Sequence, residues 1–379
     1  MLERVGGEAD AAVIETVARF AAERLAPGAA AREKAGKFEP ELIRELAGLG
    51  LFGATTDPEW GGAGLDAVTY ALALEEVAAG DGAVSTMVCV HNAPTCLVLE
   101  RFGTEAQKER WLRPLASGEA VGSFALTEPG AGSDAAAIRT RAVRRGNSGY
   151  VIDGAKQFIS NARIASAVVL FAVTDPAAGK HGISCFVVSP ETKGFTVAKL
   201  EEKLGQKASD TCQLVFEGME VEEDQRIGAE GEGYRIALST LEAGRIAVAA
   251  QSVGMARAAL DCAIGYAKER KTFGRPIIEH QAVGFRLAEA KTRLEAARQL
   301  TLAAARRKRD GLPAIEAACM AKLFASEAAE AVCSAAIQTL GGYGYLADFP
   351  VERIWRDVRV CQIYEGTSDV QKLILQRLL

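Results

Sequence analysis

A single glutamate near the end of the chain combines an apolar setting with a turn rich in hydrogen-bond donors. Glu365 follows the apolar residues Val360, Cys361, Ile363 and Tyr364 and precedes the sequence Gly-Thr-Ser-Asp. Apolar surroundings disfavour an ionised carboxyl group, so the pKa of Glu365 is expected to rise toward the range of a general base. The residues after it are typical of a helix N-terminus, which binds negative oxygens. Alternatively, Thr367 or Ser368 is only an N-cap and Glu365 is its solvated neighbour.

A second candidate site is the segment Ala125–Asp134, with the sequence ALTEPGAGSD. Its small residues Gly130–Gly132 allow a ligand to approach the backbone closely, and Thr127 and Ser133 offer hydroxyl groups. The segment matches neither GxGxxG nor the P-loop pattern, which argues against a Rossmann or P-loop enzyme. A plain Gly-rich turn would explain the same residues without a ligand.

Two further segments place an aromatic or cationic side chain beside polar ones. Phe158 and Ser160 are two residues apart, so on one strand they would face the same side and could meet one ligand. The alternative is an aromatic core residue with a surface serine. Arg270 lies at the end of an expected helix, where it could hold a phosphate or simply complement the helix dipole.

The composition excludes several classes of protein. A length of 379 residues suggests about two or three domains. The 44 Lys+Arg against 49 Asp+Glu give a net charge of −5, which attracts neither nucleic acid nor an anionic membrane. The eight cysteines form no CxxC pair, and His91, His181 and His280 are widely spaced. No metal site is therefore predicted.

The sequence also gives an expectation about location. The first ten residues carry three acidic side chains and no apolar stretch, and no later run reaches about 18 uninterrupted apolar residues. The scattered cysteines are expected to be reduced and mostly buried thiols. We therefore predict a cytoplasmic protein that is neither exported nor membrane-spanning.

Hydrophobic periodicity divides the chain into three regions, 1–120, 121–227 and 228–379. The first is helical, with an apolar stripe from Val13 to Leu25. The second contains short β-branched and aromatic runs separated by turn residues, without a helix-length pattern between them. The third predicts helices over about 233–268, 280–309, 314–340 and 366 to the end. We predict an α+β multidomain protein with an N-terminal helical domain, a middle antiparallel β-barrel or sandwich domain and a C-terminal four-helix bundle.

The order and spacing of these motifs resemble the acyl-CoA dehydrogenase family over essentially the whole chain. The matching segments are Ala125–Asp134, Phe158–Asn161, Leu241–Ala250, Tyr266–Gln281, Gln338–Tyr345 and Ile363–Gln371. The resemblance implies the acyl-CoA dehydrogenase fold, an FAD cofactor and oxidation of an acyl-CoA thioester to the trans-2-enoyl-CoA. It also implies a homotetramer, a dimer of dimers with FAD sites shared between subunits, and electron-transfer flavoprotein as the electron acceptor.

The resemblance carries over site residues position by position. The FAD contacts it implies in the middle region are Phe124, Leu126, Thr127, Gly132, Ser133, Phe158, Ile159 and Ser160. Those implied toward the FAD of a neighbouring subunit are Arg270, Gln281, Gln338, Leu340, Gly341 and Gly342, and Phe273, Thr367 and Asp369 are further cofactor contacts. The implied acyl-CoA contacts are Ser133, Glu242, Arg245, Tyr364 and Gly366.

Glu365 matches the catalytic base of the family. In this chemistry the carboxylate takes the α-proton while the β-hydrogen leaves as hydride to flavin N5, so neither a nucleophile nor a metal is required. The N–H of the same residue helps to stabilise the developing enolate. A minority branch that includes isovaleryl-CoA dehydrogenases has its base at a position that aligns with Gly244, where this chain cannot supply one. Phe158, Glu242 and Asp369 stand where Trp, Asp and Glu are commoner.

The substrate class is expected from a shorter stretch. Ser85–Glu119 looks most like the short-chain, butyryl-type members, and Ser85 aligns where the glutaryl-oxidising branch has an arginine. Short-chain or short branched-chain acyl-CoA is therefore the expected substrate. Other classes remain open: an acyl-CoA oxidase that reduces O2, a flavin monooxygenase, and a non-catalytic protein that binds acyl-CoA or flavin.

Overall fold

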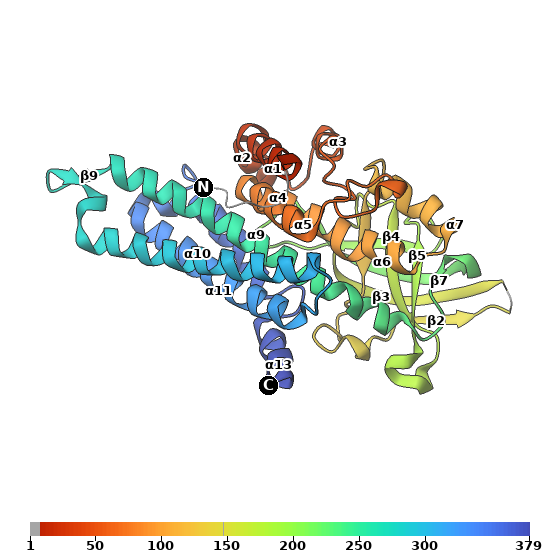
Figure 1. The fold of residues 1–379 in the computed structure, drawn as a ribbon. Helices are drawn as coiled ribbons and strands as arrows, with labels where there is room; N and C mark the ends of the chain where they lie inside the picture. The colour runs from red at the N-terminus through yellow and green to blue at the C-terminus, as the bar shows by residue number, and fades with distance from the viewer. Residues whose placement is uncertain (1–7, 147) are drawn as a thin grey trace.

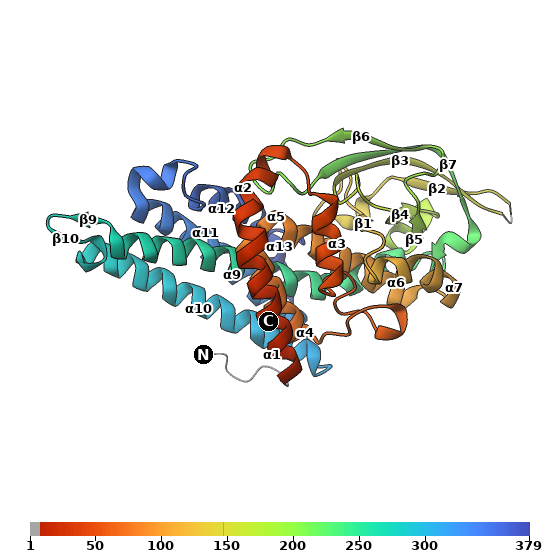
Figure 2. The same cartoon turned by 90° about the horizontal axis from the view of Figure 1, so that it is seen from above.

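The computed structural model describes residues 8–146 and 148–379. The chain forms an elongated molecule, with a long helical bundle at one end and a β domain at the other (Figure 1). Between the two ends, the N-terminal helices α4 and α5 pack against the long helix α9, and α1 and α2 pack against α4 (Figure 2). The predicted architecture of helices, β domain and helices is confirmed.

The N-terminal region contains helices of different lengths. They are α1 (Glu8–Phe20), α2 (Ala26–Ala35), α3 (Pro40–Gly48), α4 (Ala67–Gly80), α5 (Gly82–Val90), α6 (Leu97–Phe102), α7 (Glu105–Gln107) and α8 (Arg113–Ala116). Two of these helices begin with side-chain caps: Asp66 accepts from the N–H groups of Val68 and Thr69, and Thr104 with Gln107 forms a capping box.

One helical stretch of this region, Gly82–Phe102, is long and apolar enough to cross a membrane by length and composition. Its most apolar window is 89% buried inside the protein. A helix of a protein core passes the same test, and burial on this scale is typical of one.

The β domain is a single eight-stranded sheet. Its strands are β1 (Gly122–Ala125), β2 (Arg141–Arg144), β3 (Gly149–Ser160), β4 (Ala167–Val173), β5 (Ile183–Val188), β6 (Phe195–Leu200), β7 (Thr211–Glu222) and β8 (Arg226–Ile227). The order is β6-β7-β3-β2-β4-β5-β8, and β1 pairs with β4. The sequence runs did not reveal the short strands β1, β2 and β8.

The prediction of a wholly antiparallel sheet was wrong at β4. Both β1 and β2 pair with β4 in parallel, whereas the other neighbouring strands are antiparallel. A parallel pair needs a crossover connection of a dozen or more residues. The β2–β3 hairpin and the loop before it supply that connection between β1 and β4. Hydrophobic runs indicate that strands exist but not their relative direction.

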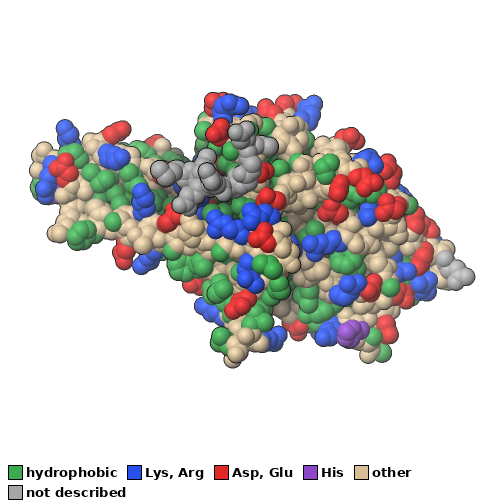
Figure 3. All heavy atoms as spheres, in the orientation of Figure 1, with side chains coloured by type: hydrophobic (Ala, Val, Ile, Leu, Met, Phe, Trp, Pro, Cys, Tyr) green, Lys and Arg blue, Asp and Glu red, His purple; other side chains and the backbone are tan. Residues whose placement is uncertain are grey.

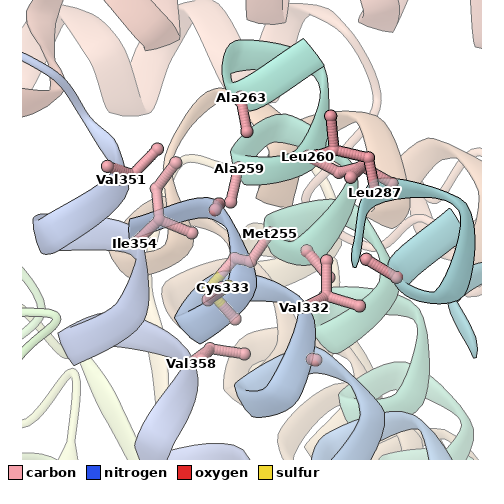
Figure 4. Packing of buried hydrophobic residues seen from close by; sticks show 14 of the residues in the cluster. Met255, Ala259, Leu260, Ala263, Leu287, Val332, Cys333, Val351, Ile354 and Val358 are labelled. Carbon is pink, nitrogen blue, oxygen red and sulfur yellow. The ribbon is translucent and has the colours of Figure 1, made fainter. Parts of the chain in front are cut away.

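The C-terminal region is the predicted helical bundle. Its elements are α9 (Gly233–Glu269), α10 (Gln281–Arg309), α11 (Ile315–Leu340), α12 (Val351–Val358) and α13 (Ser368–Leu378), with a small hairpin of β9 (Lys271–Thr272) and β10 (Arg275–Pro276) after α9. The helix α12 and the hairpin were not predicted. Figure 4 shows the bundle core, where buried side chains from four helices meet: Met255, Ala259, Leu260, Ala263, Leu287, Val332, Cys333, Val351, Ile354 and Val358.

Candidate active site

Glu365 lies on a tight turn between α12 and α13, against the long helix α9. Its backbone is left-handed, with a φ of 55°, and Gly366 follows with a φ of 87°. The carboxylate rests on Gly244 of α9 so closely that a Cβ atom there would lie 2.6 Å from its Oε2 atom. Glycine at 244 therefore provides the space in which the Glu365 carboxylate lies.

Two cationic side chains flank this carboxylate from different helices. Burial raises the pKa of Glu365, and the positive charges of Arg245 on α9 and Lys322 on α11 oppose that rise. Arg245 is buried, and its Nε atom has no hydrogen-bond partner within the described residues. The predicted direction of the Glu365 pKa is confirmed. Thr367 is also an N-cap, because its side chain accepts from the Val370 N–H, but the burial of the Glu365 carboxylate contradicts the alternative that it is only a solvated neighbour of that cap.

The peptide groups of the turn are held by two fully buried side chains that the sequence reasoning missed. Lys322 Nζ donates to the Gly366 carbonyl at 2.6 Å, and Gln371 Nε2 donates to the Gly366 and Glu365 carbonyls at 2.8 and 3.2 Å. None of the described residues accepts from the Glu365 N–H. The signal for Lys322 was present, since it is a charge on the same helical face as the apolar residues Ala318 and Ala325.

Tyr364, a predicted substrate contact, is tied to the N-terminal helices. Its hydroxyl donates to Gln251 Oε1 at 2.9 Å, and Gln251 Nε2 donates to Ser85 Oγ and Thr86 Oγ1 at 2.9 and 3.2 Å. Thr86 in turn donates to Gln206 at 2.6 Å. These polar atoms satisfy one another beside the base, and Ser85, which is fully buried, brings no positive charge.

The other predicted substrate contacts differ in their availability. Glu242 forms an ion pair with Lys308 of α10 at 2.7 Å, so a bound substrate would compete with Lys308 for its carboxylate. Ser133 is exposed in the loop after β1, and its hydroxyl has no partner within the described residues. Gly366 lies directly beside Glu365 in the turn.

The predicted flavin segment is anchored by a buried ion pair. Lys156 Nζ donates to Glu128 at 2.8 Å and to the Leu126 carbonyl at 2.9 Å, and the Glu128 carboxylate accepts from the N–H groups of Arg139 and Thr140. Gly130 and Gly132 lie in this segment with no atom within 4 Å of where a Cβ would stand. The segment is thus fixed at its base and open along its tip.

Phe158 faces away from the core, so its interpretation as an aromatic core residue was wrong. The residue has a φ of 62° and its side chain is 63% exposed, whereas Ile159 is buried. A β-bulge between Lys156 and Ile159 interrupts the pairing of β3 with β7 at this point. Bulges re-aim side chains next to active sites, and here the chain beside the bulge meets the flavin segment, since the Gln157 N–H donates to the Thr127 carbonyl at 2.9 Å.

The second group of predicted cofactor contacts lies far from the first within one chain. Arg270 follows α9, Phe273 is 96% exposed in the β9–β10 hairpin, and both occupy the end of the bundle opposite the β domain (Figure 1). Gln281 begins α10, and Gln338, Leu340, Gly341 and Gly342 lie where α11 ends. A cavity of about 410 Å³ opens here between Tyr266, Arg270 and Phe349. The structure does not bring the two groups together in a single subunit.

Several features of these residues fit a bound FAD. Five non-glycine residues among those described have a left-handed backbone, and three of them, Phe158, Phe273 and Glu365, are predicted site residues. Such strain costs of order 1–3 kcal/mol each and clusters at functional sites. Polar side chains of the predicted cofactor set have no partner within the described residues: Thr127, Ser133, Ser160, Arg270, Gln281, Gln338 and Asp369. The Ser368 hydroxyl, between Thr367 and Asp369, is buried and unpartnered.

Three family models match the chain, one for each region. They describe the acyl-CoA dehydrogenase N-terminal domain over residues 7–119, the middle domain over 123–219 and the C-terminal domain over 231–379. The human protein named short-chain specific acyl-CoA dehydrogenase, mitochondrial, is 44% identical over 363 residues, which cover 96% of this chain and 88% of the relative.

Solved structures are similar over the whole chain. The butyryl-CoA dehydrogenase of Megasphaera elsdenii has a TM-score of 0.96 at 39% identity and covers 100% of this chain and 99% of its own. A chain from a structure described as the electron transferring flavoprotein of Acidaminococcus fermentans has a TM-score of 0.97 at 42% identity, with coverage of 100% and 99%.

Proposed function

The chain belongs to the acyl-CoA dehydrogenase family, and on that premise we propose that it oxidises short-chain acyl-CoA thioesters with Glu365 as the base. It is an FAD-dependent oxidoreductase acting on acyl-CoA. The observation that carries the assignment of the base is the position of the Glu365 carboxylate, held against Gly244 between two buried cations.

The carboxylate and the N–H of Glu365 have different roles in the reaction. The Glu365 carboxylate removes the α-proton, and its raised pKa makes it a stronger base than an exposed glutamate. The free N–H of Glu365 donates to the thioester carbonyl and stabilises the enolate as charge develops there. When bound, FAD accepts the β-hydrogen as hydride. Arg245 and Lys322 keep the carboxylate ionised before it acts.

Two observations support a short acyl chain. The human relative is named short-chain specific and the Megasphaera relative is named butyryl-CoA dehydrogenase, and both align with nearly the whole of this chain. The Tyr364–Gln251–Ser85 hydrogen bonds also form a closed polar wall beside the base. Extending an apolar chain into that wall would bury methylene groups against polar atoms and break their hydrogen bonds.

We further propose that the enzyme passes electrons to an electron-transfer flavoprotein and works as a homotetramer with shared FAD sites. The separation of the two predicted cofactor groups supports sharing between subunits. Exposed apolar side chains on the bundle support assembly, among them Phe285, Phe324 and Leu373, and Figure 3 shows hydrophobic side chains gathered over the lower face of the bundle and the C-terminal helix. A cytoplasmic location is part of the proposal, in keeping with eight free cysteines.

An anaerobic titration of the purified protein tests the function. We expect a yellow protein whose flavin absorbance bleaches with butyryl-CoA and barely changes with palmitoyl-CoA. Each methylene group that the pocket does not accommodate costs about 1–3 kcal/mol, so palmitoyl-CoA should react far less than butyryl-CoA. Slow reoxidation by O2 and fast reoxidation by electron-transfer flavoprotein would distinguish a dehydrogenase from an oxidase. A protein that stays colourless after incubation with FAD would contradict the proposal.

Arg270 offers a test of the shared cofactor site. We expect Arg270→Gln to weaken FAD binding roughly tenfold or more, because a hydrogen bond to a charged group contributes about 1.5–3 kcal/mol. Titration of the apoprotein with FAD, followed by flavin fluorescence, measures the change. Arg19→Gln is the matched control, since Arg19 is also exposed and has no partner within the described residues. Equal FAD affinities in the two variants would show that Arg270 does not contact the cofactor.

A further inference from the structure

Lys322 is a buried cation to which no carboxylate of the described residues is hydrogen-bonded. Of the described lysines, only Lys156 and Lys322 are buried, and Lys156 is paired with Glu128. Lys322 instead donates to a neutral group, the Gly366 carbonyl, at 2.6 Å. Burial of an ammonium group is costly unless charge or hydrogen bonds compensate it. A lysine retained under these conditions indicates a role for its charge or its donor at this place.

The group that Lys322 holds is the turn that carries the proposed base. Glu365 and Gly366 both have left-handed backbones, which for glutamate is a strained conformation. Lys322 and Gln371 together give three hydrogen bonds to the two carbonyls of this turn. The carbonyls are thus fixed, whereas the Glu365 N–H has no acceptor among the residues that the structure describes.

The charges around the Glu365 carboxylate are few. Arg245 faces it from α9 and Lys322 from α11, and both favour its ionised form. The Cys89 thiol of α5 also lies close enough to interact with it. Cys361 and Cys319 lie near the ammonium of Lys322, and burial lowers the pKa of Lys322 to about 8. Lys322 is therefore mostly charged at neutral pH and below.

We propose that Lys322 is a positioning residue for the reaction. It holds the Gly366 carbonyl so that the turn presents the Glu365 carboxylate and N–H together, and it supplies one of the two positive charges that keep the carboxylate ionised. The proposal rests on the proposed function, in which Glu365 is the base. It extends that function by assigning proton removal to Glu365 and the positioning and ionisation of Glu365 to Lys322.

Two variants separate the contribution of the charge from that of the hydrogen bonds. Lys322→Met removes both the charge and one donor while keeping an unbranched side chain. Gln371→Met removes two donors and leaves every charge in place. The measurement is the rate of flavin reduction by butyryl-CoA in the FAD-loaded protein, by anaerobic stopped flow between pH 5.5 and 9. Lys291→Met, which removes an exposed lysine of α10, is the matched control.

In Lys322→Met we expect the acid limb of the pH profile to move up by about one pH unit, because a neighbouring opposite charge lowers a carboxyl pKa by about 1–3 units. On the high-pH plateau of each profile, where the rate no longer depends on ionisation of the base, the remaining loss of rate reports on positioning. Gln371→Met should lose rate at every pH without moving the limb. Lys291→Met should match the wild type.

A folded, FAD-loaded Lys322→Met protein with the wild-type rate and acid limb would overturn the inference. If Lys322→Met does not fold, Lys322→Gln replaces it in the comparison. A wild-type pH profile in Lys322→Gln would equally overturn the inference. The wild-type protein tests the proposed function first: if butyryl-CoA does not reduce its flavin, the function fails before any variant is compared. A reducible wild type with an unchanged variant means that only the role of Lys322 is wrong.

Discussion

The Glu365→Gln protein is expected to bind FAD and acyl-CoA and to reduce its flavin about a thousandfold more slowly than the wild type. Glutamine keeps the shape of the side chain but cannot accept the α-proton, and general base catalysis typically contributes 10²–10⁴-fold. The hydrogen bonds that hold the turn involve backbone carbonyls, so the substitution leaves them in place. Stopped-flow reduction by butyryl-CoA measures the loss.

Binding must be measured separately for this result to identify a base. The flavin content of the purified variant and the spectral change on adding a substrate analogue report whether both ligands are retained. Glu15→Gln is a suitable control, because it makes the same change of charge at an exposed position on α1. Turnover of Glu365→Gln close to the wild-type value would require a different base.

Most of the helical architecture was predictable because it depends on local patterns. The periodic apolar residues of α9, α10 and α11 predicted helices within one or two residues of their observed bounds. The caps at Asp66 and Thr104 were equally local. The relative direction of β1 and β4 was not predictable in this way, since it depends on how the connection between them crosses the sheet.

The sequence selected candidate site residues, but it did not predict the contacts that hold them in place. Glu365, Phe158 and Phe273 were selected as site residues, and all three have strained backbones. No sequence pattern predicts this strain. The supporting residues escaped notice because they act across long sequence separations. Lys322 contacts the turn at Gly366 from another helix. This contact can be recognised only once α11 and α13 are packed together.

Gly244 is a second position whose role could not be predicted from the sequence. Its alignment with the base of a minority branch indicated only that this chain has no base there. The structure adds that the Glu365 carboxylate occupies the space above it, with the Cδ atom 3.0 Å from a Cβ built at 244. Two positions that are far apart in the sequence thus converge on one point.

Gly244→Ala is therefore expected to reduce turnover about a hundredfold without loss of stability. The added methyl group would lie 2.6 Å from Oε2, well inside ordinary contact, so the carboxylate must move. A displacement of about 1 Å in a catalytic group can cost about 100-fold in rate. The carboxylate is the end of a flexible side chain, so the fold itself has little to rearrange. Flavin reduction by butyryl-CoA and a thermal unfolding midpoint measure the two effects.

The variant is informative because turnover and thermal stability are expected to change independently. Alanine in place of glycine inside a helix stabilises it by up to about 1 kcal/mol, so the unfolding midpoint should stay or rise while turnover falls. Gly48→Ala is the matched control, since Gly48 is helical and nothing lies within 4 Å of its added Cβ. Full activity in Gly244→Ala would mean that the carboxylate works from a different position. A falling midpoint would mean that the methyl group disturbs the packing of α9, and that the loss of rate is not specific to the base.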